Sequence, residues 1–257
     1  MREARVSEMS GGLGQFFYAV ILPEEKPLPD LMGLDDGKVH MISHRDVAAA
    51  VSDYPVTTIK PLRKNLSPYH RGTRILADAC TTIPARFGQI AHSREETLWV
   101  LRHHYPRIRQ ELERLRHKVE MGVRVFWQVD NLFEYLIQQD RTLKALRDRL
   151  LHRSSPVTRQ EQIEFGGHLR DKLQETRERV SQKAMAYLRE VAAEVKVDEP
   201  TEEKMALNGL FLVRKEQQEE FVGKVERVAG LMGEEYGLKV DGPWVPFNFV
   251  RHIELGL

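Results

Sequence analysis

The chain has 257 residues, of which 30% are charged and 41% are apolar, and its 39 basic and 38 acidic side chains leave a net charge of +1. This apolar content is too high for a disordered protein, and no apolar run reaches the roughly 18 residues of a membrane-spanning helix. The balanced charge argues against a general nucleic-acid binder, because such proteins neutralise phosphates with excess Lys and Arg. The single cysteine, Cys80, excludes an internal disulfide framework and a cysteine-rich metal site.

The first half of the chain predicts a short leader followed by an α+β domain. Residues 1–14 are polar and glycine-rich and have no apolar core of a secretory signal, so we expect a flexible leader on a soluble, cytoplasmic protein. Aromatic and β-branched runs predict strands, and one apolar face predicts a helix. The predicted strands are 15–22, 39–43 and 46–52, the helix is 69–79, and 81–87 is expected to be a strand or an extended segment.

A helix with a break follows this domain's strands. Ser93 with Glu96 three residues later has the spacing of a capping box, so we expect a helix to begin there. Pro106 predicts an interruption near Tyr105. The run 119–128 then alternates apolar and other residues with the period of a strand.

Two long, highly charged helical stretches lie in the middle of the chain. Asp130 precedes leucines at near-heptad spacing, and a second apolar stripe runs through 158–193 after the turn formed by Ser154, Ser155 and Pro156. Matching stripes joined by a short turn predict a long antiparallel helical hairpin over about 130–193, part of it resembling a coiled coil.

The end of the chain completes a recognisable order of elements. Strands are predicted at 195–198 and 205–214, a helix at 216–236 and an extended segment at 238–253. From residue 119 onward the order is that of a βαββαβ ferredoxin-like fold, with the hairpin expanding its first crossover. We therefore predict an α+β protein of two domains, an N-terminal α+β domain at 15–117 and a C-terminal ferredoxin-like domain at 118–257.

Known catalytic and ligand-binding motifs are incomplete in this sequence. The glycines between Gly11 and Gly14 lack the Lys-Ser/Thr pair of a phosphate loop, and His44-Arg45-Asp46 lacks the other kinase motifs and predicts a tight turn. The histidines show no metal-binding spacing, and Cys80 is expected to pack as a small apolar residue. These patterns predict no catalytic residue, no cofactor and no metal.

One local cluster of positive charge stands out against the neutral total. It could bind phosphate or an acidic partner surface, although with one aromatic neighbour, Tyr69, it makes a poor stacking platform for single-stranded nucleic acid. Its members are Lys60, Arg63, Lys64, His70, Arg71 and Arg74.

Three segments together resemble the gas vesicle protein F/L family. The first runs from Tyr54-Pro55-Val56 through Asn65 and His70 to Ile83-Pro84-Ala85-Arg86-Phe87-Gly88, and is similar to a family segment of the form (L/I)P-x-RFG. The second, 119–126 (VEMGVRVF), resembles the family's EWGVKV strand, and the third, 242–249 (GPWVPFNF), resembles its closing GPWPPYxF. Met121 stands where the family often has Trp, and Phe247 where Tyr is common.

The resemblance implies a non-enzymatic, minor structural or assembly component of the gas vesicle, acting at the gas vesicle in the cytoplasm. It implies two domains, the second ferredoxin-like with a helical hairpin. The expected partners are the small hydrophobic shell protein and accessory gas vesicle proteins, with no nucleic acid and no membrane. It leaves open the oligomeric state, the choice between protein F and protein L, and whether the chain acts on the gas-facing surface, in a nucleation complex or as a cytosolic chaperone.

Two of the family segments carry the candidate partner-binding residues. Aromatic side chains beside arginine on proline- and glycine-restricted backbone suit a protein interface, whereas the alternative is that they close the two domain cores. The candidates are Arg86, Phe87, Trp244, Phe247 and Phe249. The alternative functions are an enzyme that uses a cleft between the domains and a nucleic-acid-binding ferredoxin-like module.

Overall fold

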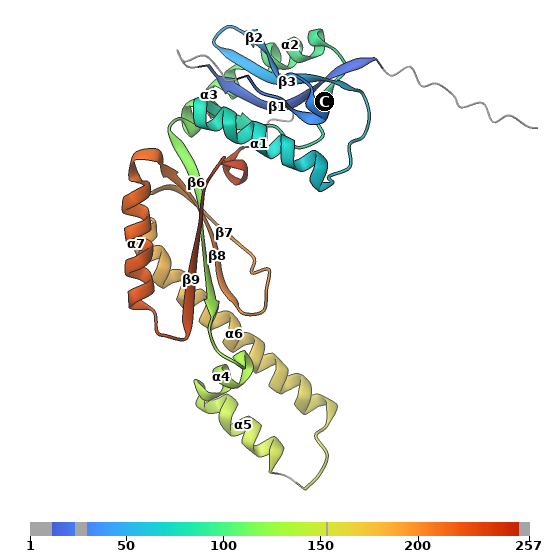
Figure 1. The fold of residues 1–257 in the computed structure, drawn as a ribbon. Helices are drawn as coiled ribbons and strands as arrows, with labels where there is room; N and C mark the ends of the chain where they lie inside the picture. Colours follow the sequence, from blue (N-terminus) through green and yellow to red (C-terminus); the bar gives the residue numbers. More distant parts are fainter. Residues whose placement is uncertain (1–11, 24–29, 153, 252–257) are drawn as a thin grey trace, which may run out of the picture. The chain divides into compact units, whose positions relative to one another are not determined.

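The computed structural model describes residues 12–23, 30–152 and 154–251, and the chain forms two compact units (Figure 1). The first unit contains the residues up to Val119 and those from Trp244 onward, and the second is Glu120–Pro243. We expected a domain boundary near 117, and the first stretch of the first unit ends at Val119. The expectation that all of 118–257 forms the second domain differs from the structure, since the chain returns to the first unit at Trp244. Of the predicted leader, residues 1–11 lie outside the described residues, whereas Leu13 and Gly14 belong to the first strand.

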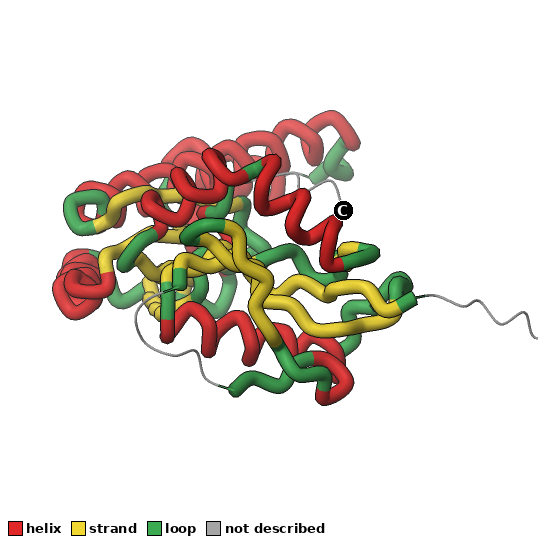
Figure 2. Tube along the Cα trace, turned by 90° about the horizontal axis from the view of Figure 1, so that it is seen from above, coloured by secondary structure: helices red, strands yellow, loops and turns green. Residues whose placement is uncertain are grey.

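An antiparallel sheet built around one buried strand forms the centre of the first unit. The strands are β1 (Leu13–Leu22), β2 (His40–His44), β3 (Val47–Pro55), β4 (Thr81–Pro84) and β5 (Ile90–Ala91). Their order is β2-β3-β1-β4, and β5 pairs with β1 beside it. The run from Phe16 to Ile21 is buried on both faces because helices cover both sides of the sheet (Figures 1 and 2). The predicted tight turn at Arg45 and Asp46 is confirmed, with Arg45 at φ 54°.

Three helices pack on this sheet. They are α1 (Arg63–Ala79), α2 (Arg94–His103) and α3 (Tyr105–Leu115). Helix α1 begins before the predicted start at 69 and continues through Pro68, because Tyr69 and Leu76 bury their side chains against the sheet. The predicted start at Ser93 is confirmed, since its hydroxyl accepts the Glu96 amide at 3.1 Å. The predicted break is also confirmed, with α3 starting at Tyr105.

The second unit has a four-stranded sheet and four helices within its described residues. Its strands are β6 (Lys118–Trp127), β7 (Ala192–Asp198), β8 (Met205–Arg214) and β9 (Tyr236–Trp244), in the order β7-β8-β6-β9. Its helices are α4 (Leu132–Gln138), α5 (Arg141–Leu151), α6 (Arg159–Leu188) and α7 (Gln218–Leu231). Helices α6 and α7 pack on β8 and on each other, and α4 and α5 pack on α6 to form the hairpin (Figure 1).

The first arm of the hairpin is two helices, and the prediction of one continuous helix was wrong. The Asp140 carboxylate accepts the amides of Thr142 and Leu143 at 2.9 and 3.0 Å, which caps a new helix and ends the previous one. The second arm starts as predicted, because Thr158 and Glu161 form a full capping box. It ends at Leu188, before the predicted end at 193, since β7 begins at Ala192.

The last helix is shorter than predicted. We expected it to continue to Tyr236, but α7 ends at Leu231 and Tyr236 already begins β9. Glycines at 230 and 233 weaken the helix, and Met232 leaves it with extended backbone at φ −83° and ψ 152°. None of the described helices combines the length and the apolar content needed to cross a membrane.

Candidate functional site

All five candidate partner-binding residues belong to the first unit. Arg86 and Phe87 lie in the turn between β4 and β5. Trp244 ends β9, and Phe247 and Phe249 bound a single 3-10 turn, η3 (Phe247–Phe249). Two segments that are far apart in the sequence therefore contribute to one unit.

The Arg86–Phe87 turn is held to the sheet by backbone hydrogen bonds. The Ala85 amide donates to the Tyr18 carbonyl at 3.0 Å, and the Phe17 amide donates to the Gln89 carbonyl at 2.9 Å. Gly88 has φ +88°, a left-handed conformation that favours glycine at this position of the turn. The turn exposes Arg86 and leaves Phe87 half-buried.

Tyr69 joins the two candidate segments. Its ring centroid lies 5.4 Å from that of Phe87 and 6.2 Å from that of Phe247, and Phe16 and Tyr18 of β1 lie 6.2 and 6.3 Å away. The Tyr69 hydroxyl donates to the Ala85 carbonyl, and burial raises the pKa of this phenol. The sequence did not mark Tyr69 as a site residue. The one signal for it was its place on the apolar face of a predicted helix, which indicates burial.

Phe249 is an anchor of the C-terminal segment. Its side chain is 2% exposed, and its carbonyl accepts a hydrogen bond from the Arg114 guanidinium. Glu111 accepts bonds from Arg114 at 2.6 Å and from the Arg251 amide at 2.7 Å. Burial opposes ionisation of Glu111, but the hydrogen bonds from Arg114 and Arg251 hold its pKa below the usual value. Phe249 therefore fits the alternative expectation, in which the aromatic residue closes a core.

Trp244 and Phe247 differ from Phe249 in exposure. Trp244 is 50% exposed and Phe247 is 37% exposed. Phe247 packs edge-on to His70 at 6.0 Å between ring centroids while its other side remains accessible. The structure thus supplies two accessible aromatic side chains next to a segment that Phe249 fixes in place.

A groove of about 650 Å³ runs beside the Arg86–Phe87 turn. The two segments that line it are 56–59 and 86–90, and Arg86 is its one charged residue. Apolar side chains such as Ile59 and Ile90 are half-buried along it. A groove with this lining can hold extended apolar chain but has no acid–base pair for catalysis.

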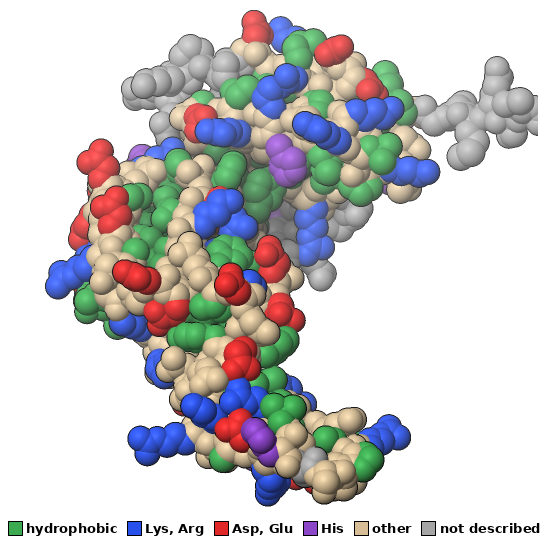
Figure 3. Space-filling view, turned by 60° about the horizontal axis from the view of Figure 1, so that its bottom comes forward, with side chains coloured by type: hydrophobic (Ala, Val, Ile, Leu, Met, Phe, Trp, Pro, Cys, Tyr) green, Lys and Arg blue, Asp and Glu red, His purple; other side chains and the backbone are tan. Residues whose placement is uncertain are grey.

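The basic cluster predicted from the sequence forms one exposed surface along α1. Arg63, His70, Arg71 and Arg74 recur at helical spacing, all are exposed, and basic side chains gather on this face (Figure 3). Among the described residues, no ion pair engages Arg63, Arg71 or Arg74. His70 connects this basic face to Phe247.

The described residues present no metal centre and no activated nucleophile. Within 12–23, 30–152 and 154–251, no three His, Cys, Asp or Glu side chains are grouped so as to hold a metal ion. Cys80 is buried as predicted, and its thiol donates to the Leu76 carbonyl at 3.2 Å.

The fold and the surface together place this chain in the class of proteins with mixed helix and sheet, and its first unit carries an accessible aromatic and basic face. The gas vesicle synthesis protein GvpL/GvpF family matches residues 14–251, so the chain belongs to this family. It is 23% identical to gas vesicle protein F of Dolichospermum flosaquae, over 86% of this chain and 91% of the relative, and 24% identical to gas vesicle protein F of Nostoc sp., over 95% and 99%.

Solved structures of family members have the same fold. The crystal structure of gas vesicle protein GvpF from Anabaena sp. superposes with a TM-score of 0.82 at 22% identity, covering 94% of this chain and all of that one. GvpF from Microcystis aeruginosa gives a TM-score of 0.77 at 20% identity, with coverage of 92% and 98%. Family membership implies a role related to the gas vesicle and suggests interaction with other gas vesicle proteins, and the relatives' names indicate no catalytic activity.

Proposed function

We infer that this chain is a non-enzymatic structural or assembly component of the gas vesicle that binds the small hydrophobic shell protein through its first unit, together with accessory gas vesicle proteins. The observation that carries this inference is the pair of accessible aromatic side chains, Trp244 and Phe247, on a segment anchored by Phe249. The site of action is the gas vesicle within the cytoplasm.

The chemistry of this face suits an apolar partner. Aromatic and arginine side chains are enriched at the centres of protein interfaces, where they bury area at small entropic cost. Phe247 already packs against Tyr69 and His70 on one side, so its side chain loses little conformational freedom when a partner binds. A shell protein with apolar surface would cover Phe247, Trp244 and the groove beside Arg86, and would itself be shielded before assembly.

The basic face of α1 complements this aromatic surface. Its exposed arginines adjoin Phe247 through His70, and unpaired cations of one sign steer an approaching partner of opposite charge. We assign the basic face to the rate of encounter and the aromatic residues to the stability of the complex.

The second unit is assigned to the ferredoxin-like class in the same proposal. Its element order from β6 to β9 is strand, helices, strand, strand, helix, strand, and the sheet order β7-β8-β6-β9 places the first and third of these strands at the centre. The hairpin of α4, α5 and α6 occupies the first crossover.

A matched pair of phenylalanines tests the binding surface. Phe247 in the first unit is 37% exposed and Phe133 in α4 is 38% exposed. With a soluble fusion of the shell protein as the probe, we expect Phe247→Ala to weaken binding about tenfold or more and Phe133→Ala to leave it unchanged. Equal affinities for the two variants would contradict the assignment, as would the absence of binding by the folded wild-type chain at micromolar concentration.

A further inference from the structure

The two halves of the helical hairpin are packed to different degrees. In the inner half, Leu136, Leu143 and Val180 are buried. Toward the turn, Leu151 is 70% exposed and Ile163 is 59% exposed, and no residue of α6 before Thr176 is buried. The outer half is therefore packed less tightly, and it leaves Leu151 and Ile163 largely uncovered.

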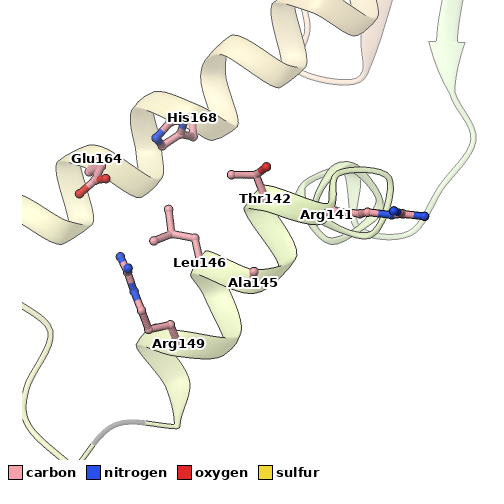
Figure 4. Close-up of a pocket in the computed structure, with 7 residues that line it drawn as sticks. All are labelled: Arg141, Thr142, Ala145, Leu146, Arg149, Glu164 and His168. Atoms are coloured by element: carbon pink, nitrogen blue, oxygen red, sulfur yellow. The ribbon is translucent and has the colours of Figure 1, made fainter.

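A groove lies between α5 and α6 in this outer half. It has a volume of about 530 Å³. Leu146 points from α5 toward α6, and Arg149 extends to the same side at one end, facing the α6 residues Glu164 and His168 (Figure 4). The α5 residues that line the groove lie between Arg141 and Arg149, a length of about 13 Å, so the groove accommodates roughly two and a half turns of a third helix.

The charge along α5 is predominantly positive. The helix has four cations, Arg141, Lys144, Arg147 and Arg149, and one acid, Asp148. Arg147 is already paired with Glu134 at 2.6 Å and with Asp148 at 2.8 Å. Among the described residues, Arg149 makes no ion pair or side-chain hydrogen bond, although it borders the groove. The groove is lined by the apolar side chains of Ala145 and Leu146, by two cations of α5, Arg141 and Arg149, and by one acid of α6, Glu164. Because its cations lie on the α5 side, the groove favours an apolar occupant whose acidic flank faces α5.

We propose that this groove binds an amphipathic helix of a partner protein, with the apolar stripe of that helix on Leu146 and its acidic flank along α5. Helix-in-groove docking uses anchors at i, i+3, i+4 and i+7, which is the repeat that a helix laid over α5 and α6 presents. A second copy of this chain fits poorly, because pairing two α5 helices would bring their cations together. This surface belongs to the second unit, whereas the aromatic face assigned to the shell protein belongs to the first.

A designed peptide pair tests the chemistry of the occupant. The probe is a fluorescein-labelled amphipathic helix of about three heptads with leucine at the core positions and glutamate on the flanks, and its control has lysine in place of each glutamate. Fluorescence anisotropy with the full chain is expected to show binding of the glutamate peptide that weakens with salt, and at least about tenfold weaker binding of the lysine peptide. Equal affinity for the two peptides, or no binding of either, would overturn the proposal.

Matched charge reversals locate the site. We expect Arg149→Glu to weaken binding of the glutamate peptide about tenfold and Arg179→Glu to leave its affinity unchanged. Arg179 is a matched control because it is exposed on the inner half of the same helix pair and its reversal gives the same change in net charge. Leu146→Gln should also weaken binding, with thermal unfolding used to verify that each variant is folded.

Two further outcomes decide against the proposal. If Arg149→Glu binds the glutamate peptide as the wild type does, the peptide lies elsewhere. If sedimentation shows a wild-type dimer that Arg149→Glu dissociates, the groove is occupied by a second copy of the chain. Shell-protein binding by Arg149→Glu is measured in parallel and is expected to match the wild type, so failure of this groove and failure of the aromatic face are distinguished.

Discussion

The aromatic core of the first unit and the outer half of the helical hairpin are built by opposite means. In the first unit, Phe16 and Tyr69 bring together strand, helix and C-terminal segment through ring contacts of 5 to 6 Å, such as the 5.0 Å between Phe16 and Tyr18. In the outer hairpin, the helices are fixed by local hydrogen bonds, namely the N-terminal caps that Asp140 and Thr158 form. Long-range burial holds the first unit together, whereas the capped helices leave Leu151 and Ile163 exposed as surface for a partner.

The largest expected effect comes from removing the centre of the aromatic core. Phe16 is buried and its ring lies within about 6 Å of Tyr54 and Phe87. Phe16→Ala should destabilise the first unit by about 3–5 kcal/mol through lost burial and the cavity left behind. Urea denaturation followed by tryptophan fluorescence measures the loss. A change below about 1 kcal/mol would show that the aromatic contacts do not hold the unit together.

The second-largest effect is expected from the ion pair of Glu111 and Arg114, which anchors the C-terminal segment. Glu111→Ala leaves the Arg114 guanidinium, which is largely withdrawn from solvent, without its carboxylate and should cost about 3 kcal/mol. Because the pKa of Glu111 is lowered in the folded state, its contribution is present above the ordinary carboxyl pKa of about 4.3 and is lost as the pH falls through the lowered value. Stability measured against pH should therefore fall more steeply on the acid side for wild type than for Glu111→Ala. If the free energy of unfolding fell with the same slope in the wild type and in Glu111→Ala, this stabilising role of the Glu111 carboxylate would be contradicted.

Two leucines of the same arm sharpen the contrast within the hairpin. Leu136 is buried in α4 and Leu146 is half-buried in α5. Leu136→Ala should cost about 3 kcal/mol and Leu146→Ala about 1 kcal/mol, because the second side chain has less surface to lose. Thermal unfolding compares the two variants directly, and equal losses would indicate that the outer half is packed as tightly as the inner half.

The smallest expected effect concerns the cap of the long helix. Thr158 and Glu161 satisfy each other's backbone amides at the start of α6. Thr158→Ala should cost about 1 kcal/mol and should act on the first turns of α6 only. Hydrogen exchange is expected to become faster near Thr158 and to remain unchanged around Val180. Faster exchange along the whole helix would mean that the hairpin unfolds as one unit.

Local patterns in the sequence predicted much of this fold, and long-range contacts account for what they missed. The 205–214 strand is observed with those bounds, and the Ser93 cap and the break at Tyr105 were readable because each depends on a few neighbouring residues. The return of Trp244 onward to the first unit depends on Arg114 and Glu111, which lie far away in the sequence. The break at Asp140 was missed because a capping side chain interrupts an otherwise regular leucine repeat.

The candidate site was predicted only in part for the same reason. The sequence pattern was enough to select aromatic and arginine residues on conformationally restricted backbone as candidates, namely Arg86, Phe87, Trp244 and Phe247. Exposure separates Phe247 from the buried Phe249 two residues later, and no local pattern encodes that difference. Tyr69, which joins the two segments, was hidden within an ordinary amphipathic helix.

Hydrogen exchange of the full chain with and without the shell-protein fusion tests the central claim most directly. If the aromatic face binds the shell protein, amides in 86–90 and 245–250 should exchange more slowly in the complex, while those in 141–151 and 159–170 should be unchanged. Protection confined to the hairpin, with exchange around Phe87 and Phe247 unaltered in a complex that has formed, would contradict it.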